Sequence, residues 1–274
     1  MMPTGYTYLY TTIVVTMFVL LPMARMHVVA AAFGGGRSSS STITTIGTGA
    51  AAASAAHATT STALCAEQIC ALGMGCFWKP SETMLSVDGV VSTMAGYSGK
   101  AGATKPPSYS DVCASRDWVE AVRVTYEDDI ITYPELLDAY FEAQEAKLGS
   151  RQYAPIIFAA GEEQMVESQT WLTKAREEQR VGKGGIPALA VTVEPASKFY
   201  KAEGYHQSFW PKNRPRFALG FVLLAVSSGA LDSIIPNADI ADKVETVANN
   251  AFLIGALALQ AERWIDKDVV EVPV

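Results

Sequence analysis

Apolar and polar residues follow two different periods along the chain after residue 66, and these periods predict alternating strands and helices. A period of two is typical of a strand with one buried face, and a period of 3.6 is typical of an amphipathic helix. WVEAVRVTYE (118–127) alternates as a strand does, whereas the large apolar residues between 136 and 141 share a helical face behind a Thr132–Glu135 capping box. The predicted strands are 67–75, 90–95, 118–127, 153–160 and 188–194, and the predicted helices are 77–88, one that begins after Thr132, and 161–179.

The order of these elements predicts the fold class. Strands and helices follow one another as β-α-β-β-α-β with an added helix, which indicates an α+β fold. We expect a two-layer sandwich at 67–214, in which flanking helices cover a mixed sheet of ferredoxin-like topology. The segment 98–110 is rich in Gly and Pro and is predicted to be a loop.

The tail at 215–274 has apolar patterns of its own. Residues 217–231 form an apolar run that is shorter than the ~18–20 residues of a membrane-spanning helix. Beyond a Pro236–Asn237 turn, apolar residues recur at helical spacing at Ile240, Val244, Val247, Ala251, Ile254, Ala258, Ala261 and Ile265. The tail is therefore predicted to be a C-terminal helical extension, a hairpin packed on the domain. Membrane contact through 217–231, or a surface for a partner, is the alternative.

The first 66 residues are predicted to be a targeting leader. Residues 11–24 form an apolar run of signal-peptide length, followed by an A-x-A pattern at 30–32. The stretch that begins at Phe33 is rich in Ser, Thr and Ala and has no acidic residue, as in transit peptides. A signal followed by a transit segment resembles the leader of proteins sent to plastids in algae with secondary plastids, so we expect a plastid location. A lone signal peptide or signal anchor for the secretory pathway, or a mitochondrial address, is the alternative.

Charge and cysteine spacing exclude several classes of function. Residues 1–66 contain two arginines and no acidic residue, so the other 19 basic and 28 acidic residues give the rest of the chain a net charge of −9. An acidic body without a Lys/Arg block argues against nucleic acid as a partner. Cys65, Cys70, Cys76 and Cys113 match no common zinc spacing and are too few for a disulfide scaffold. We therefore expect no metal, and a redox-active or nucleophilic thiol remains open.

Cys76 lies where a predicted strand ends and a predicted helix begins. Free backbone N–H groups and the helix dipole favour an anion at such a point, so we expect a lowered thiol pKa and a nucleophilic thiolate. Gly73 and Gly75 allow a tight turn, and Phe77 and Trp78 supply an apolar wall beside the sulfur. A core cysteine in an aromatic cluster is the alternative on this pattern alone.

The MGCFW segment resembles the nucleophile signature of peptide-methionine (S)-S-oxide reductases, the A-type methionine sulfoxide reductases. The resemblance covers about residues 69–210 and continues in register through VDGVVSTMAGYSG, PPSYSDVC, EAVRVTYE, LLDAYFEAQ, RQYAPIIF and FYKAEGYHQSFW. It implies an oxidoreductase that reduces methionine-S-sulfoxide, protein-bound or free, to methionine through a cysteine sulfenic acid. The implied role is repair of oxidised proteins under oxidative stress, with thioredoxin or another thiol reductant as electron donor and no bound cofactor.

The resemblance assigns the chemical roles to particular residues. Cys76 matches the nucleophile that attacks the sulfoxide sulfur, and Glu120 matches the acid that protonates the sulfoxide oxygen. The strand pattern supports Glu120 independently, because it shares a face with Val122 and Val124 and should point into an apolar core. Burial would raise the pKa of this carboxyl and keep it protonated at neutral pH.

The resemblance also assigns the substrate pocket. Phe77 and Trp78 match residues that receive the substrate methyl group, and Tyr109 and Tyr153 match two tyrosines that hydrogen-bond the sulfoxide oxygen. Glu203 and His206 lie in a stretch similar to the family's A-E-x-x-H-Q and would line the pocket. His206 as a general base for Cys76, in a Cys-His thiol hydrolase, is a rival hypothesis. A catalytically inactive binding protein that keeps the pocket is another.

The match departs from the family at several positions. Lys79-Pro80 replaces the Gly that usually follows CFW, and Lys79 would either lower the pKa of Cys76 further or narrow the pocket mouth. The family's His-Asp-Pro loop, and its Asp before G-x-Q-Y, are missing from this chain. Because that Asp helps to hold the active-site network in the family, its loss puts the reaction rate and the substrate range of this protein in question. No cysteine follows Cys113, so the usual C-terminal resolving cysteine is absent. Cys113 is the first candidate for that role and Cys70 the second, with direct reduction by an external thiol as the alternative.

Overall fold

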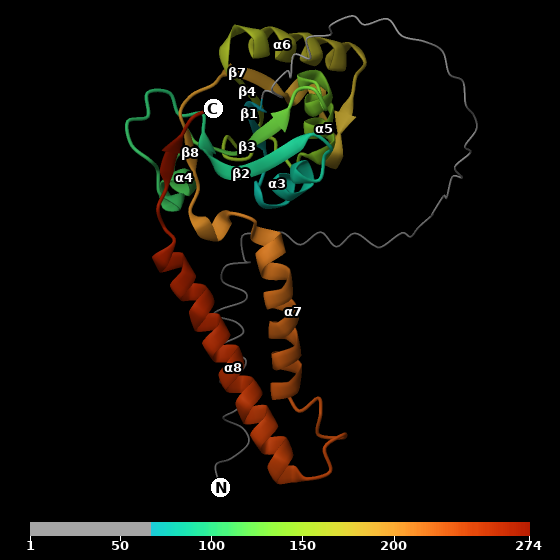
Figure 1. The fold of residues 1–274 in the computed structure, drawn as a ribbon, viewed down its shortest axis with the longest axis vertical. Coiled ribbons are helices and arrows are strands. Elements are labelled where there is room, and N and C mark those ends of the chain that lie inside the picture. Colours follow the sequence, from blue (N-terminus) through green and yellow to red (C-terminus); the bar gives the residue numbers. More distant parts are fainter. Residues whose placement is uncertain (1–66) are drawn as a thin grey trace, which may run out of the picture. The chain divides into compact units, whose positions relative to one another are not determined.

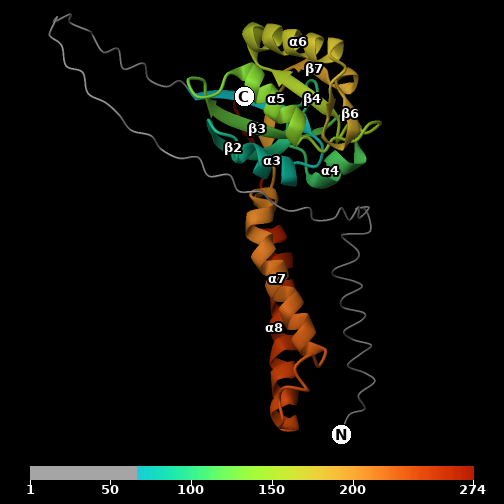
Figure 2. The same cartoon turned by 90° about the vertical axis from the view of Figure 1, so that its right-hand side faces the viewer.

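The structure of the protein, a computed structural model, describes residues 67–274 (Figures 1 and 2). The predicted leader at 1–66, with its plastid address and Cys65, lies outside the described residues.

The central elements follow the predicted order. They are β1 (Glu67–Met74), α3 (Trp78–Leu85), β2 (Val90–Ser98), β3 (Val119–Glu127), α5 (Tyr133–Ala143) and β4 (Pro155–Ala159). The other elements of the domain are α4 (Tyr109–Ala114), α6 (Gly161–Glu177), β5 (Val181–Gly182), β6 (Ile186–Pro187), β7 (Thr192–Pro195) and β8 (Phe199–Lys201). The capping box at the start of α5 is present, since the Glu135 carboxylate accepts a hydrogen bond from the Thr132 backbone at 2.9 Å.

One seven-stranded mixed sheet has the strand order β7-β4-β1-β3-β2-β8-β9. Strand β1 pairs antiparallel with both β3 and β4, and β4 pairs parallel with β7. The four central strands thus have the ferredoxin-like order β4-β1-β3-β2. This confirms the predicted α+β fold.

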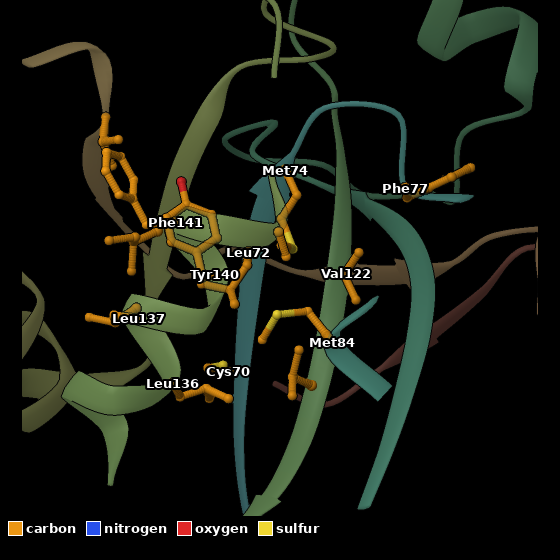
Figure 3. Packing of buried hydrophobic residues seen from close by; sticks show 14 of the residues in the cluster. Cys70, Leu72, Met74, Phe77, Met84, Val122, Leu136, Leu137, Tyr140 and Phe141 are labelled. Atoms are coloured by element: carbon orange, nitrogen blue, oxygen red, sulfur yellow. The ribbon is translucent and has the colours of Figure 1, made fainter. Parts of the chain in front are cut away.

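The helices α3, α5 and α6 contribute to the core on one face of the sheet, which confirms the two-layer arrangement. Figure 3 shows side chains of this core from β1, α3 and α5, namely Cys70, Leu72, Met74, Met84, Leu136, Leu137, Tyr140 and Phe141. The alternate residues of β1 point the other way, and Ala71 belongs to a smaller cluster that Val272 and Val274 help to cover. Alternation along β1 therefore directs its side chains into two separate clusters.

Two short segments differ from the sequence prediction. The predicted strand 188–194 begins as a 3-10 helix (Ala188–Ala190), and the strand itself starts only at Thr192. The Arg176 side chain explains the difference, because it donates to the carbonyls of Ala188 at 3.4 Å and Val191 at 2.8 Å and holds the backbone out of the sheet.

The predicted loop at 98–110 ends in a helix, α4, that the Gly/Pro content conceals. Ser108 and Asp111 form a capping box, in which Asp111 accepts from the Ser108 backbone at 2.9 Å. This S-x-x-D signal is present in the sequence. It matters for function because α4 begins with Tyr109 and contains Cys113.

The C-terminal segment contains two helices and one strand. Helices α7 (Phe209–Ser227) and α8 (Ala238–Ile265) form a hairpin that extends away from the sheet (Figures 1 and 2), and β9 (Val270–Val272) returns to pair with β8. The hairpin packs on the domain only near its base, where Arg214 contacts Glu82 at 2.6 and 2.7 Å. None of the helices in the described part of the chain combines the length and apolar character needed to cross a lipid bilayer.

Candidate active site

Cys76 lies in the short connection between β1 and α3, as the sequence predicts. Gly75 has a φ of +84°, and a Cβ at this position would overlap the carbonyl group of Glu145. Only glycine fits this left-handed, close-packed turn. The turn brings the chain round so that Cys76 precedes the first turn of α3, where its sulfur interacts with the backbone N–H of Trp78.

The expected lowering of the thiol pKa is wrong for the free protein. Burial, followed by the negative charge of Glu120, raises the pKa of Cys76 to about 12, although the Trp78 N–H and Lys147 act in the opposite direction. Lys79, which we expected beside the sulfur, instead pairs with Glu82 at 3.2 Å. The helix terminus does contribute as predicted, but desolvation of the thiolate outweighs it.

Glu120 points into the protein, as the alternation of β3 predicts, and its side chain is 1% exposed. One carboxyl oxygen accepts from the side-chain amide of Gln152 at 2.7 Å, and the other accepts from the backbone N–H of Phe77 at 3.3 Å. Burial raises the pKa of Glu120 to about 7 despite these two donors. The bond to Phe77 places the carboxyl directly beside the residue that follows Cys76.

Tyr153 and Tyr109 lie on the same side of the site. The Tyr153 hydroxyl lies 3.2 Å from the Gln152 amide and hydrogen-bonds Tyr109. Burial is the largest cause that raises the pKa of both tyrosines, and the negative charge of Glu120 is the second largest. Both phenols are therefore protonated at neutral pH and can donate hydrogen bonds. The structure thus brings both predicted tyrosines to the predicted acid.

The two candidate resolving cysteines have opposite surroundings. Cys113 is exposed on α4, within 3.9 Å of the Gln152 amide that also bonds Glu120. Cys70 is fully buried in β1, and burial raises its pKa to about 12. Four residues of extended strand, about 13 Å, and the turn at Gly75 separate Cys70 from Cys76. Access therefore favours Cys113.

Phe77 and Trp78 form an aromatic wall that His206 supports from behind. Phe77 is 1% exposed, and its ring lies 5.1 Å from the His206 ring. The indole N–H of Trp78 donates to Nδ1 of His206 at 2.9 Å, and the indole stacks on Phe209 at 3.7 Å with an interplanar angle of 2°. The wall is therefore fixed on two sides.

His206 is not placed as a base for Cys76. Its side chain is 2% exposed, burial lowers its pKa to about 3, and Nδ1 is occupied as the acceptor from Trp78. A neutral imidazole with this acceptor engaged cannot take the thiol proton through Nδ1. The geometry agrees with a structural role at the pocket and gives no support to a Cys-His pair.

Glu203 positions other residues of the site. Its carboxylate accepts from the Tyr97 hydroxyl at 2.8 Å and from the backbone N–H of Tyr109 at 3.2 Å. Glu203 itself is 4% exposed. It thus attaches the start of α4 to the sheet and sets the position of Tyr109.

Sequence reasoning missed three residues that support the site. Gln152 bonds Glu120 through its side chain, and its carbonyl accepts the Glu120 N–H at 2.8 Å. Arg151 anchors the same loop through two bonds to Glu194, at 2.5 and 2.7 Å. Both lie in the RQY motif, but nothing in their spacing shows what they contact. Phe209 could be suspected only from its place after His206 in HQSF.

The chain is similar to known proteins of one family. Residues 68–222 match the family described as peptide methionine sulfoxide reductase. A peptide methionine sulfoxide reductase of Methanothermobacter thermautotrophicus is 35% identical over 53% of this chain and 86% of its own length, and one of Pseudomonas syringae pv. tomato is 34% identical over 52% and 67%. Among solved structures, methionine sulfoxide reductase A of Corynebacterium diphtheriae is 26% identical and aligns over 54% of this chain and 75% of that one, with a TM-score of 0.42. The family match covers more than half of the chain, which therefore belongs to the peptide methionine sulfoxide reductase family.

Proposed function

We propose that this enzyme reduces methionine-S-sulfoxide to methionine, with Cys76 as the nucleophile and Glu120 as the proton donor. The observation that carries the proposal is the fully buried carboxyl of Glu120, with a pKa raised to about 7, beside the thiol turn in a chain of this family. Such a carboxyl keeps a large protonated fraction at neutral pH, as protonation of the sulfoxide oxygen requires.

In the proposed reaction Glu120 gives its proton to the sulfoxide oxygen while the sulfur of Cys76 attacks the sulfoxide sulfur. The proton of the Cys76 thiol passes to the Glu120 carboxylate, which restores the acid. The hydroxyl then transfers to the sulfur of Cys76, and the sulfur–sulfur bond breaks. Two electrons from Cys76 have reduced the substrate, so the products are the methionine thioether and a sulfenic acid on Cys76.

The arrangement of the pocket supports selection of one epimer. The aromatic wall of Phe77 and Trp78 offers an apolar surface for the substrate methyl group. Glu120, Tyr109 and Tyr153 offer donors for the oxygen on another side. When the methyl group, the oxygen and the attacking sulfur each have a fixed place, only one configuration at the sulfoxide sulfur fits.

The sulfenic acid must be reduced before the next turnover. We propose that Cys113 attacks it, which releases water and forms a Cys76–Cys113 disulfide, and that a thioredoxin-like protein or a small thiol reduces the disulfide. The exposure of Cys113 and its closeness to Gln152 support this route. Direct reduction of the sulfenic acid by an external thiol is the alternative.

The activity can be tested with the two epimers of a methionine sulfoxide peptide and dithiothreitol as reductant. We expect turnover of the S epimer alone, and none by the Cys76→Ser variant. Equal turnover of the R epimer would contradict the proposed pocket. Absence of turnover by the wild-type protein, with Cys76 shown to be reduced, would indicate a binding protein that keeps the pocket.

We also keep the plastid location as a proposal. Its support is the order of an apolar signal-like run, Phe33 and an acid-free Ser/Thr-rich stretch in residues 1–66. A fluorescent protein fused behind residues 1–66 should accumulate in the plastid of an alga with a secondary plastid. Fluorescence confined to the secretory pathway or the mitochondrion would identify one of the alternative addresses.

A further inference from the structure

Helix α8 has an apolar stripe that is mostly exposed, with only Val244 and Ala251 half-buried. The stripe consists of Ile240, Val244, Val247, Ala251, Ile254, Ala258, Ala261 and Ile265. Ile240, Val247 and Ile254 are separated by seven residues each, and their exposed fractions are 51%, 67% and 66%. A heptad spacing is typical of a helix that packs along another helix. The stripe runs along most of a helix of about 42 Å, which is a long apolar surface for a monomer.

Helix α7 does not cover this stripe because it packs on a different face of α8. The buried residues of α8 are Ala241 and Ala248, also seven residues apart, and Phe252 lies against Gly220 of α7. Small residues on this face let the two helices approach closely. At 100° per residue, Ala248 lies about 120° around the helix from Ile254. Helix α8 therefore has two faces with heptad spacing, of which α7 occupies one.

The distribution of charge along the hairpin indicates the orientation in which a second hairpin would bind. No charged residue occurs in 217–231 or 246–261. The tip of the hairpin, 232–245, has four acidic residues and one lysine, which is a net charge of −3. The base of the hairpin, 212–216 together with 262–268, has five basic and three acidic residues, which is a net charge of +2. A second hairpin that runs antiparallel places each acidic tip at a basic base, and a parallel one places like charges together.

We propose that the stripe of α8 binds the same stripe of a second copy of this chain in antiparallel orientation, which makes the enzyme a two-fold symmetric dimer. Centred on Ile254, this arrangement sets Ile254 against Ile254 of the second copy and Val247 against its Ala261. The contact is isologous, as a closed dimer requires.

A membrane surface fits the stripe less well than a second copy. Helices that lie in the lipid interface are rich in Lys and Arg on their polar face. Helix α8 contains four acidic residues and two basic ones, Lys243 and Arg263. Anionic lipid headgroups would repel this polar face, whereas the basic base of a second hairpin attracts its acidic end.

Sedimentation velocity of the full-length chain over a range of concentrations tests the dimer. We expect a monomer–dimer equilibrium, and Ile254→Glu should raise the dimer Kd about a hundredfold or more because two carboxylates would meet in an apolar contact. Asn249→Glu is the matched control, since Asn249 is an exposed residue of the same helix about 140° away from Ile254. Circular dichroism checks that both variants remain folded.

Engineered cysteines test the orientation. Under mild oxidation Ile254→Cys should form a covalent dimer through the two copies of residue 254, and Val247→Cys should do so only when Ala261→Cys is present as well. Val247→Cys cross-linking to itself would indicate a parallel pair and overturn the proposed orientation. A chain that stays monomeric, a dimer that is insensitive to Ile254→Glu, or binding to phosphatidylserine vesicles through the stripe in place of dimerisation would overturn the proposal.

Discussion

At the scale of single residues, the carboxyl of Glu120 influences the pKa of the Cys76 thiol. The Glu120 charge is the second largest cause, after burial, of the raised pKa of Cys76. Near neutral pH the Cys76 thiol is thus protonated in the free protein, and Glu120, with a pKa of about 7, is about half protonated. This agrees with a reaction that consumes one proton at the sulfoxide oxygen and takes one from the thiol. The thiolate does not need to exist before the substrate binds.

This coupling predicts opposite effects of one substitution. Glu120→Gln removes the negative charge near the sulfur, so the pKa of Cys76 falls and alkylation of Cys76 by iodoacetamide at pH 8 becomes faster. The same substitution removes the proton donor, so turnover of the S-sulfoxide falls by about 10²–10⁴. Peptide mapping after a timed alkylation measures the first effect, and a dithiothreitol-coupled assay measures the second.

Lys147→Met tests whether removal of a positive charge has the opposite effect on the alkylation rate of Cys76. The positive charge of Lys147 lowers the pKa of Cys76, so its loss should slow alkylation of Cys76 without removing the acid. If Glu120→Gln leaves both alkylation and turnover unchanged, the carboxyl neither faces the thiol nor takes part in the reaction.

The pKa of Glu120, about 7, also predicts the pH dependence of activity. The acid form is the active one, so kcat/KM should fall as the pH rises through about 7, and the Glu120→Gln variant should lose this decrease. The Cys76 thiol, with a pKa of about 12, adds no gain in activity over the same range. A kcat/KM that instead rises between pH 6 and 8 would show that deprotonation of a group, and not protonation of Glu120, limits the reaction.

At the scale of secondary-structure elements, the first residue of α7 supports the substrate wall on α3. Phe209 stacks on Trp78, and His206 accepts the Trp78 indole N–H. Phe209→Ala removes one of these two contacts. Since an aromatic pair contributes about 0.5–1.5 kcal/mol, we expect a two- to tenfold higher KM with little change in kcat.

Two further variants separate this role from a general loss of stability. Phe209→Tyr keeps the stacked ring and should restore the wild-type KM. Phe217→Ala removes another aromatic residue of α7, whose ring lies 6.5 Å from that of Phe209, and should leave KM unchanged. A lower kcat with an unchanged KM in Phe209→Ala would place its effect outside substrate binding.

The sequence predicts those parts of the site that depend on local pattern. Alternation along 118–126 is enough to point Glu120 inward, and the glycines before Cys76 are enough to predict the turn. The pKa of Cys76 depends on how deeply other elements bury it, and no local pattern contains that quantity. The position of the Gln152 side chain beside Glu120 likewise depends on contacts between residues that are far apart in the sequence. In α8 the sequence shows an apolar stripe, but only the structure shows that α7 packs on a different face.

At the scale of the whole molecule, one catalytic cycle has to connect a buried pocket with an external reductant. The sheet holds Cys76, Glu120 and the aromatic wall in place, and the cycle needs one element that can carry a second sulfur between pocket and solvent. Helix α4 fits this role because it is short, and Val112 is its one buried residue.

Recycling of Cys76 by Cys113 therefore requires a movement of α4. A disulfide needs the two Cα atoms within about 7 Å, so α4 has to shift toward Cys76 and release the bond from the Tyr109 N–H to Glu203.

One equivalent of S-sulfoxide without reductant should yield a Cys76–Cys113 disulfide. Cys113→Ser should slow turnover with thioredoxin but not with dithiothreitol, which reaches the sulfenic acid directly. Cys70→Ser is the matched control and should change neither rate, because Cys70 is buried in β1. Peptide mapping that finds Cys76 only as sulfenic acid would leave direct reduction by an external thiol as the route.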